Sequence, residues 1–246
     1  MADKYAAQEA EEKAERSETR GQREYEEKHG HRAIGDDRPA RTKKPRGANP
    51  PKTAKPIELV VGLGNPGPEY AQTRHNSGFQ TVDELARRWN VTYWKNQDGA
   101  LVATATVDGR TITLAKPQSF MNCSGGPVSK LAKRLGIAPD QLLVVHDDLD
   151  IPAGEVRVKI GGGHGGQNGM RSIIDKLGSR DFVRVRDGIG RPPGKMDPAD
   201  YVLKQMKGDV WEEQLAEASR GADAVELVLK EGPVRARDQV NGQHGQ

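Results

Sequence analysis

The chain has a single cysteine, Cys123, among its 246 residues, and aromatic residues make up only 4% of it. One cysteine excludes an intrachain disulfide, so the disulfide framework that marks many exported domains is absent. No segment approaches the roughly 18 consecutive apolar residues of a membrane-spanning helix. The net charge of +3 argues only weakly for a polyanionic partner. These features predict a protein of the reducing cytoplasm that does not contact a membrane.

The first 56 residues differ in composition from the rest of the chain, because they are charged and carry almost no apolar periodicity. We expect residues 1–56 to form a disordered tail. Its first half is acidic, whereas the stretch from Arg38 to Lys55 is basic and broken by prolines that keep it extended. A basic arm can hold phosphate backbones, which predicts at most a nonspecific contact with RNA. A solvated tail without a specific role is the simpler alternative.

From Ile57 onward, strand and helix patterns alternate. The runs IELVVGL and QLLVVHD predict buried strands, Asp108-Gly109 predicts a hairpin turn, and SGFQTVDELARRWN predicts a helix with Ser77 as its N-cap. This alternation predicts an α/β fold in which a mixed central sheet is flanked by helices on both faces. We expect one catalytic domain over residues 57–232 and a flexible C-terminal tail over residues 233–246.

Five short motifs combine glycine or proline with a polar side chain, and each lies beside a predicted strand end or turn. Rigid strands can bring side chains from several loops together at one end of a sheet. The set comprises one histidine, one carboxylate and three carboxamides, with no evident serine or cysteine nucleophile. This inventory predicts general-base hydrolysis, in which amide donors place a carbonyl group and a water molecule. The five residues are Asn65, His75, Asn122, Asp147 and Asn168.

His75 is the expected general base. It immediately precedes a predicted helix, whose positive dipole end should lower its pKa and leave a neutral imidazole at pH 7. A general base also needs a partner that fixes its tautomer. Asp147, at the end of the strand LLVVHD, is the best candidate for this carboxylate. Asp148 and Asp150 are alternatives, although their position favours a role in capping the following turn.

The motif GLGNPG satisfies the dinucleotide-binding pattern G-x-G-x-x-G after a strand. The surrounding sequence does not fit a dinucleotide-binding site, because prolines interrupt the turn and no helix begins directly after Gly67. We therefore interpret the motif as a tight Asn-Pro-Gly turn that exposes the side chain of Asn65.

Four other features support the same site or argue against rival chemistries. Phe120 and Met121 suit a pocket for varied apolar groups, although they are also consistent with core packing. The glycine-rich segment 161–166 allows close approach of the backbone to a ligand, and a helix N-terminus follows it. His146 and His164 lack the spacing of a metal site, so we expect no metal. Nothing near Cys123 in sequence would lower the pKa of its thiol, which argues against a nucleophilic role.

In this order and spacing, GLGNPG, TRHN, KPQSFMNCSG, HDDLDIPAG and GGGHGGQNG resemble the motifs of bacterial-type peptidyl-tRNA hydrolase, over about residues 57–230. The resemblance implies cleavage of the ester between a peptide and the 3′ end of its tRNA, without metal or cofactor. It implies that His75 is the catalytic base and that Asp147 orients it. It implies substrate contacts at Asn65, Tyr70, Met121, Asn122 and Asn168, and tRNA phosphate contacts at Lys159 and Arg186.

Some positions depart from the pattern of the family. Gln167 stands where many relatives have histidine, Cys123 replaces a common leucine, and Asp187 stands in a strand where an apolar residue is usual. Asp187 therefore either costs stability or marks an exposed face. None of these changes removes a catalytic group. A non-catalytic RNA-binding or splicing protein on the same fold is the alternative function, and a metal-dependent esterase is a third. We expect a monomer.

Overall fold

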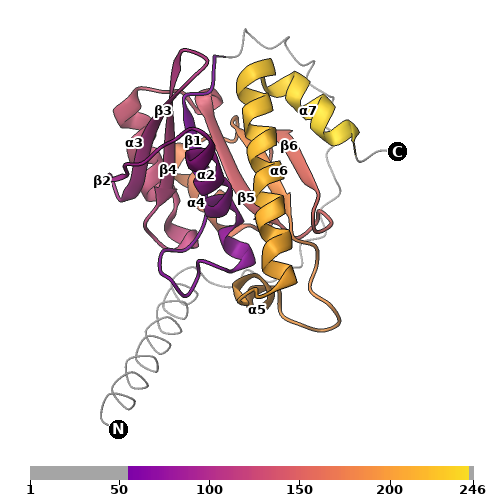
Figure 1. The fold of residues 1–246 in the computed structure, drawn as a ribbon. Helices are drawn as coiled ribbons and strands as arrows, with labels where there is room; N and C mark the ends of the chain where they lie inside the picture. Colours follow the sequence, from indigo (N-terminus) through magenta and orange to yellow (C-terminus); the bar gives the residue numbers. More distant parts are fainter. Residues whose placement is uncertain (1–54, 244–246) are drawn as a thin grey trace, which may run out of the picture. The chain divides into compact units, whose positions relative to one another are not determined.

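Residues 55–243 are the part of the chain that the computed structural model describes, and they contain one seven-stranded sheet. The expected N-terminal tail lies outside the described residues, apart from residues 55 and 56. The strand order across the sheet is β2-β3-β4-β1-β5-β7-β6 (Figure 1). The strands are β1 (Leu59–Gly62), β2 (Lys95–Gln97), β3 (Ala100–Val107), β4 (Arg110–Pro117), β5 (Leu142–Asp148), β6 (Val156–Ile160) and β7 (Val183–Gly188).

The sheet is mixed, as the sequence predicts. Strand β1 pairs in parallel with β4 and β5, and β5 pairs in parallel with β7. The pairs β2–β3, β3–β4 and β6–β7 are antiparallel. The carboxyl ends of the four parallel strands therefore lie at the same end of the sheet, and the loops that follow these strands start there. These strands are β1, β4, β5 and β7. The predicted hairpin is confirmed, because Asp108 and Gly109 join β3 to β4 with φ angles of +49° and +74°.

Helices cover both faces of the sheet, which confirms the predicted architecture (Figure 1). Their sequences alternate apolar and polar residues with helical periodicity, so each has one side that packs on the strands. The α-helices are α2 (Ser77–Arg88), α3 (Gly125–Leu135), α4 (Asn168–Leu177), α5 (Pro198–Leu203), α6 (Asp209–Glu231) and α7 (Pro233–Gly242). Within residues 55–243 there are also three short 3₁₀ helices, η1 (Arg74–Asn76), η2 (Met121–Cys123) and η3 (Pro139–Gln141).

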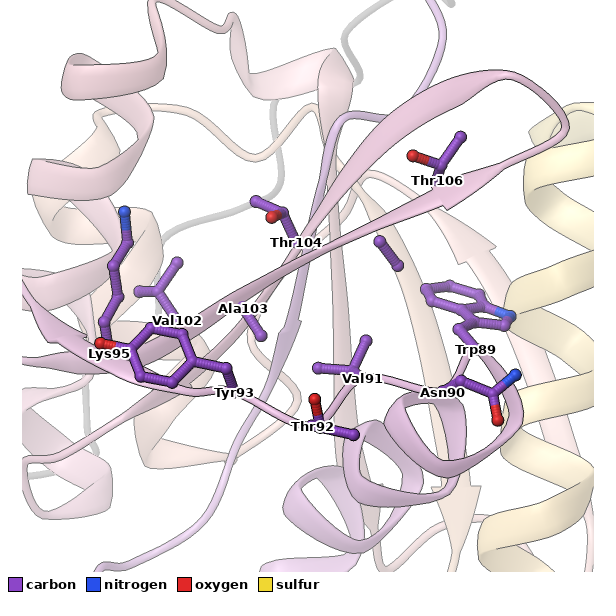
Figure 2. Close-up of a pocket in the computed structure, with 11 residues that line it drawn as sticks. Trp89, Asn90, Val91, Thr92, Tyr93, Lys95, Val102, Ala103, Thr104 and Thr106 are labelled. Atoms are coloured by element: carbon purple, nitrogen blue, oxygen red, sulfur yellow. The ribbon is translucent and has the colours of Figure 1, made fainter.

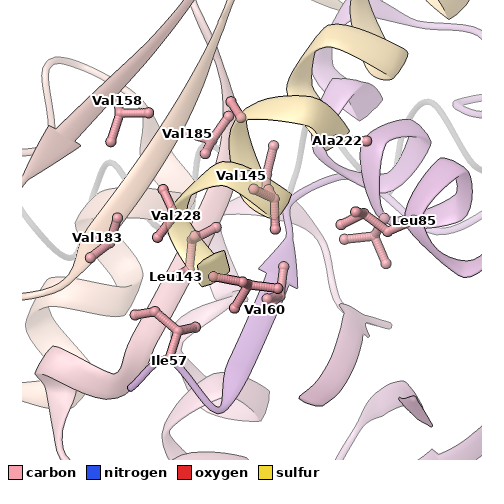
Figure 3. Close-up of a cluster of buried hydrophobic side chains, with 14 of the residues drawn as sticks. Ile57, Val60, Leu85, Leu143, Val145, Val158, Val183, Val185, Ala222 and Val228 are labelled. Atoms are coloured by element: carbon pink, nitrogen blue, oxygen red, sulfur yellow. The ribbon is translucent and has the colours of Figure 1, made fainter. Parts of the chain in front are cut away.

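The side chains of β5 alternate between two separate hydrophobic clusters. Leu143 and Val145 pack with α2, α6 and α7 in one cluster, which Figure 3 shows. Leu142 and Val144 pack with α3 and α4 in the other cluster. A strand that is covered on both faces needs apolar residues at consecutive positions, which explains the unbroken run LLVV.

Helix α7 corrects one expectation. Residues 233–246 were expected to be flexible, but Pro233–Gly242 form a helix whose Ala236 and Val240 are buried in the hydrophobic cluster. In addition, the side chain of Asn241 bonds to both the N–H and the carbonyl oxygen of Val158 in β6. Those bonds satisfy backbone groups of an edge strand, so α7 covers the edge of the sheet.

The start of α2 lies directly against the ends of β1 and β5. A Cβ atom on Gly78 would lie 2.4 Å from Val145 O and 2.4 Å from Leu63 N, and one on Gly62 would lie 2.1 Å from Gly78 O. The two backbones can approach this closely only where neither residue has a side chain. Because His75 lies three residues before Gly78, this contact places the histidine at the strand ends.

We expect Gly78→Ala to lower the free energy of unfolding by at least about 3 kcal/mol, because the methyl group would meet backbone atoms that cannot rotate away. Urea denaturation measures this loss. Gly126→Ala in α3 is the matched control, since no heavy atom lies within 4 Å of its added Cβ. The control should be stabilised by about 0.5–1 kcal/mol through helix propensity. Equal effects of the two substitutions would contradict the close-packing argument.

Candidate active site

His75 and Asp147 form a hydrogen-bonded pair at the carboxyl ends of the parallel strands. His75 Nδ1 lies 2.8 Å from Asp147 Oδ2, and the Asp147 residue is only 3% exposed. The histidine comes from η1 and the aspartate from the end of β5, so 72 residues separate them in sequence. A carboxylate can only accept, so Nδ1 carries the proton and Nε2 is the nitrogen left with a lone pair. The structure thus brings together the expected base and its expected partner.

The electrostatics of His75 differ from the expectation. Burial lowers the pKa of His75, but the charge of Asp147 and its hydrogen bond outweigh burial and raise the pKa above its ordinary value. The predicted lowering by a helix dipole is therefore wrong. Burial raises the pKa of Asp147, and the interaction with His75 reverses this, so the pKa of the carboxyl is lowered. Ser77 is also not the N-cap, because Asn76 occupies that position.

Gln167 holds the second oxygen of Asp147. Its Oε1 accepts a hydrogen bond from Met170 N at 2.7 Å, which caps α4, and its Nε2 donates to Asp147 Oδ1 at 3.0 Å. Because a backbone N–H can only donate, the cap fixes which end of the amide faces the carboxylate. Sequence reasoning noted Gln167 only as a departure from the family. Its position directly before a helix, after a glycine-rich turn, was the available signal for an N-cap.

Asn65 contradicts the expectation of an exposed side chain. It is 7% exposed, and its Oδ1 accepts a hydrogen bond from Met121 N at 2.7 Å. Asn76, which the sequence did not single out, bonds to both backbone groups of Asn65, with distances of 2.8 and 2.9 Å. Since Asn76 follows His75 directly, these bonds connect the histidine to the Asn-Pro-Gly turn and to η2.

The remaining predicted substrate residues lie in η2, at the start of α4 and in the segment between β1 and η1. Met121 is buried in η2, whereas Asn122 beside it and Asn168 at the start of α4 are exposed. The rings of Tyr70 and Phe120 pack edge to face with centroids 6.3 Å apart. Exposed carboxamides on two loops at one end of the sheet are available to bind a polar ligand.

Lys159 and Arg186 lie where the sequence predicted, on β6 and β7 near the glycine-rich segment. Lys159 is in register with Arg184, and Arg186 is in register with Arg157, so four basic residues share one face of this antiparallel strand pair. Arg186 Nε donates to Asp148 Oδ2 at 2.8 Å. Asp148 also accepts from Asp150 N, which confirms its expected role in the turn.

Arg184 is a further residue that sequence reasoning missed. It is buried, and its guanidinium donates to the carbonyl oxygens of Gly162 and Gly163. Burial lowers the pKa of Arg184 to about 10, and the nearby charges of Arg186 and Arg180 act in the same direction. Arg184 thereby anchors the glycine-rich segment to β7. The alternating pattern VRVR in the sequence was the signal for basic side chains on one face of this strand.

Two hollows in the surface are lined by neither His75 nor Asp147. One groove of about 420 Å³ runs between the loop from Trp89 to Tyr93 and strand β3 (Figure 2), and it contains none of the motif residues. A second, of about 240 Å³, lies beside η1 and α5, where the Arg74 guanidinium stacks 4.5 Å from the centroid of the Tyr201 ring. Within residues 55–243, no cluster of three metal-ligating side chains occurs and no helix is suited to cross a membrane.

The fold and the site define a single-sheet α/β protein with a histidine–carboxylate pair at the ends of its parallel strands. A family model described as peptidyl-tRNA hydrolase matches residues 59–246. The peptidyl-tRNA hydrolase of Nocardia farcinica is 49% identical over 184 residues, which cover 74% of this chain and 95% of that protein. That of Mycobacterium tuberculosis is 48% identical over 189 residues, covering 76% and 98%.

A solved structure agrees with these relatives. The peptidyl-tRNA hydrolase from Acinetobacter baumannii superimposes with a TM-score of 0.70 and 37% identity, over 75% of this chain and 94% of that one. The chain belongs to the peptidyl-tRNA hydrolase family. This confirms the family that the sequence motifs indicated, and it does not favour the alternative of a non-catalytic RNA-binding protein.

The capping role of Gln167 can be separated from its contact with Asp147. Gln167→Glu keeps an oxygen acceptor for Met170 N but replaces the donor to Asp147 with a like charge. The two carboxyls would then share a proton, so the folded-state pKa of one of them would rise above its unfolded value. A protein that contains such a group becomes less stable as pH rises. We expect the variant to be close to wild type at pH 4.5 and about 1–3 kcal/mol less stable at pH 7.5.

Urea denaturation of both proteins at the two pH values measures this difference. Gln72→Glu, at an exposed position, is the control for the added charge. A deficit for Gln167→Glu that is the same at both pH values would show that the substitution damages the cap instead.

Proposed function

We propose that the chain hydrolyses the ester bond between a peptide and the 3′ end of its tRNA, with His75 as general base. The observation that carries this proposal is the 2.8 Å contact of His75 Nδ1 with Asp147, in a site flanked by exposed carboxamides and a basic strand pair. The name shared by the relatives supports the same reaction. An ester is already activated compared with an amide, so water held by a base is sufficient.

The reaction follows from the protonation of the pair. Nδ1–H donates to Asp147, so Nε2 takes a proton from water as the oxygen of that water attacks the ester carbonyl. The tetrahedral intermediate collapses with loss of the ribose 3′ oxygen, which takes up the proton held by His75. Asp147 fixes the imidazole tautomer and stabilises the imidazolium, and it keeps its own charge throughout. No covalent intermediate on the protein is required.

The carboxamides divide into two roles. Asn122 and Asn168 are exposed, and we assign them to the peptide backbone and to the oxygen that becomes negative in the tetrahedral intermediate. A preorganised donor to such an oxygen contributes roughly 2.7–4 kcal/mol. Asn65 is buried against Met121, so we assign it to shaping the site through η2. Tyr70, which packs on Phe120, and Met121 form the apolar side of the peptide site.

We assign Lys159 and Arg186 to phosphate groups of the tRNA. Both lie on the basic face of the antiparallel β6–β7 strand pair, and the glycine-rich segment follows β6. Contacts to phosphate position RNA without reading its sequence, which suits an enzyme that must accept any stalled tRNA. We also propose that the protein acts as a cytoplasmic monomer without a cofactor, and that the basic stretch ending at Lys55 adds nonspecific contacts with RNA.

His75→Ala should lower the release of N-blocked aminoacyl groups from tRNA at least 100-fold, because a general base contributes about 10²–10⁴-fold. Asp147→Asn should cause a smaller loss of kcat. Asp150→Asn is the matched control, because its carboxylate is exposed and pairs with Arg191 on the surface. The assignment fails if His75→Ala stays within tenfold of wild type, or if Asp150→Asn costs as much as Asp147→Asn.

Lys159→Ala should raise KM for peptidyl-tRNA. It should also make the slope of log binding constant against log salt concentration shallower by about one, which corresponds to the loss of one phosphate contact. It should have little effect on a minimal ester substrate that lacks the body of the tRNA. Lys130→Ala, at an exposed position in α3, is the control for removal of one positive charge. Equal losses on both substrates would place Lys159 at the reacting bond and not at a phosphate.

A further inference from the structure

Two acidic side chains are buried together behind the active site. Asp187 at the end of β7 is 0% exposed, and Glu217 in α6 is 4% exposed. Asp187 Oδ1 and Glu217 Oε1 have no hydrogen-bond partner among the residues that the structure describes. Buried carboxyl groups are rare unless they are paired, and each isolated charge is costly to remove from water. The expectation that Asp187 marks an exposed face is therefore wrong.

The sheet register places Asp187 beside the catalytic pair. Asp147 and Asp187 are register partners on the parallel strands β5 and β7. Register partners point to the same face of a sheet, which here is the face that α2 and α6 cover. Because neighbouring strands lie about 4.8 Å apart, Asp187 lies next to the carboxylate that holds His75.

Both covering helices approach the carboxyl group of Asp187. From α2, Thr81 Oγ1 donates to Asp187 Oδ2 at 3.2 Å. From α6, Gly221 comes so close that an added Cβ would lie 2.9 Å from Asp187 Oδ1. Glu217 lies one helical turn before Gly221 and so faces the same side of α6. Three elements thus converge on one buried cluster that touches the back of the active site.

Burial raises the pKa of Asp187 to about 7, and the charge of Asp147 adds to this, whereas Ser77, Thr81 and Arg220 act in the opposite direction. Burial raises the pKa of Glu217 to about 9, with the charges of Asp187 and Glu213 adding to it. Glu217 therefore stays protonated near neutral pH, where Asp187 changes its charge. The charged or titratable groups that bear on the cluster are Arg220, Glu213 and Glu217 from α6, Asp147 and His146 from β5, and His75 from η1.

We propose that Asp187 is a positioning residue that sets the pH range in which His75 can act, with Glu217 as its buried, protonated neighbour. The inference rests on the function proposed above, because it concerns the same histidine. When Asp187 ionises, it adds a negative charge beside Asp147 and so favours the imidazolium form of His75. His75 then keeps its proton to higher pH. Protonation of His75 disfavours protonation of Asp187, and the reverse also holds, so each group titrates over a wider pH range than an isolated group. The loss of activity at acidic pH should therefore extend over a wide pH range.

The pH dependence of kcat/KM for N-blocked aminoacyl-tRNA tests this inference. In wild type, the acid side of the profile should rise by less than tenfold per pH unit. In Asp187→Asn, it should rise tenfold per pH unit and lie at least about half a pH unit lower, since one coupled charge is gone. Asp223→Asn is the matched control, because that exposed carboxylate of α6 pairs with Arg88 on the surface. The control profile should match wild type.

A readout without substrate separates this inference from the proposed function. The titration of His75 followed by NMR should show a pKa at least about half a unit lower in Asp187→Asn than in wild type. An unchanged His75 titration would overturn the inference even in an active enzyme. Absence of hydrolysis by the wild type would overturn the proposed function, and the titration would still test the inference. If Asp187→Asn fails to fold, Asp187→Val supplies the same loss of charge with an apolar side chain.

Thermal denaturation gives a second, independent measurement. A carboxyl whose folded pKa lies above its unfolded value makes the protein less stable as pH rises through that interval. The melting temperature of wild type should therefore fall between about pH 5 and pH 9, and Glu217→Gln should reduce this fall. A slope that is the same in Glu217→Gln as in wild type would show that the pair does not carry raised pKa values, and would overturn the inference.

Discussion

The contact between the backbones of Gly62 and Gly78 underlies the rest of the site. Because neither residue has a side chain, the first turn of α2 lies against the ends of β1 and β5. This places η1 at the mouth of the sheet, where His75 meets Asp147. A shift of α2 by the width of one methyl group would break a hydrogen bond that tolerates only a few tenths of an ångström. Packing in the core therefore determines the geometry of the proposed chemistry.

Around that contact, the polar side chains hold one another in chains of hydrogen bonds. Gln167 caps α4 and occupies one oxygen of Asp147, while His75 occupies the other. Asn76 ties the segment that follows His75 to the turn containing Asn65, and Asn65 in turn holds η2. Each of these side chains thus has a partner and a fixed orientation. Such a network fixes the orientation of the His75 imidazole, because few of its members can rotate.

The hydrogen-bond network does not neutralise all of the buried acidic groups. Asp147 is stabilised by His75, but Asp187 and Glu217 lie behind it without a cation in direct contact among the described residues. Their raised pKa values keep most of that negative charge off the protein at moderately acidic pH. The protein therefore combines a hydrogen-bonded histidine–carboxylate pair with a neighbouring group whose charge varies near neutrality. Stability and the protonation of the active site are coupled through the same few side chains.

The strands, the Asp108-Gly109 hairpin, the two-sided sheet and the placement of His75, Asp147, Lys159 and Arg186 could be predicted from the sequence, because local periodicity and motif order carry that information. Other features depended on contacts between residues far apart in the chain. These are the burial of Asn65, the donor role of Gln167, the anchoring by Arg184, the packing of α7 and the raised pKa of His75. Burial and pairing are properties of the assembled fold, so only the tertiary structure could decide which polar side chains are exposed and which hold the site together.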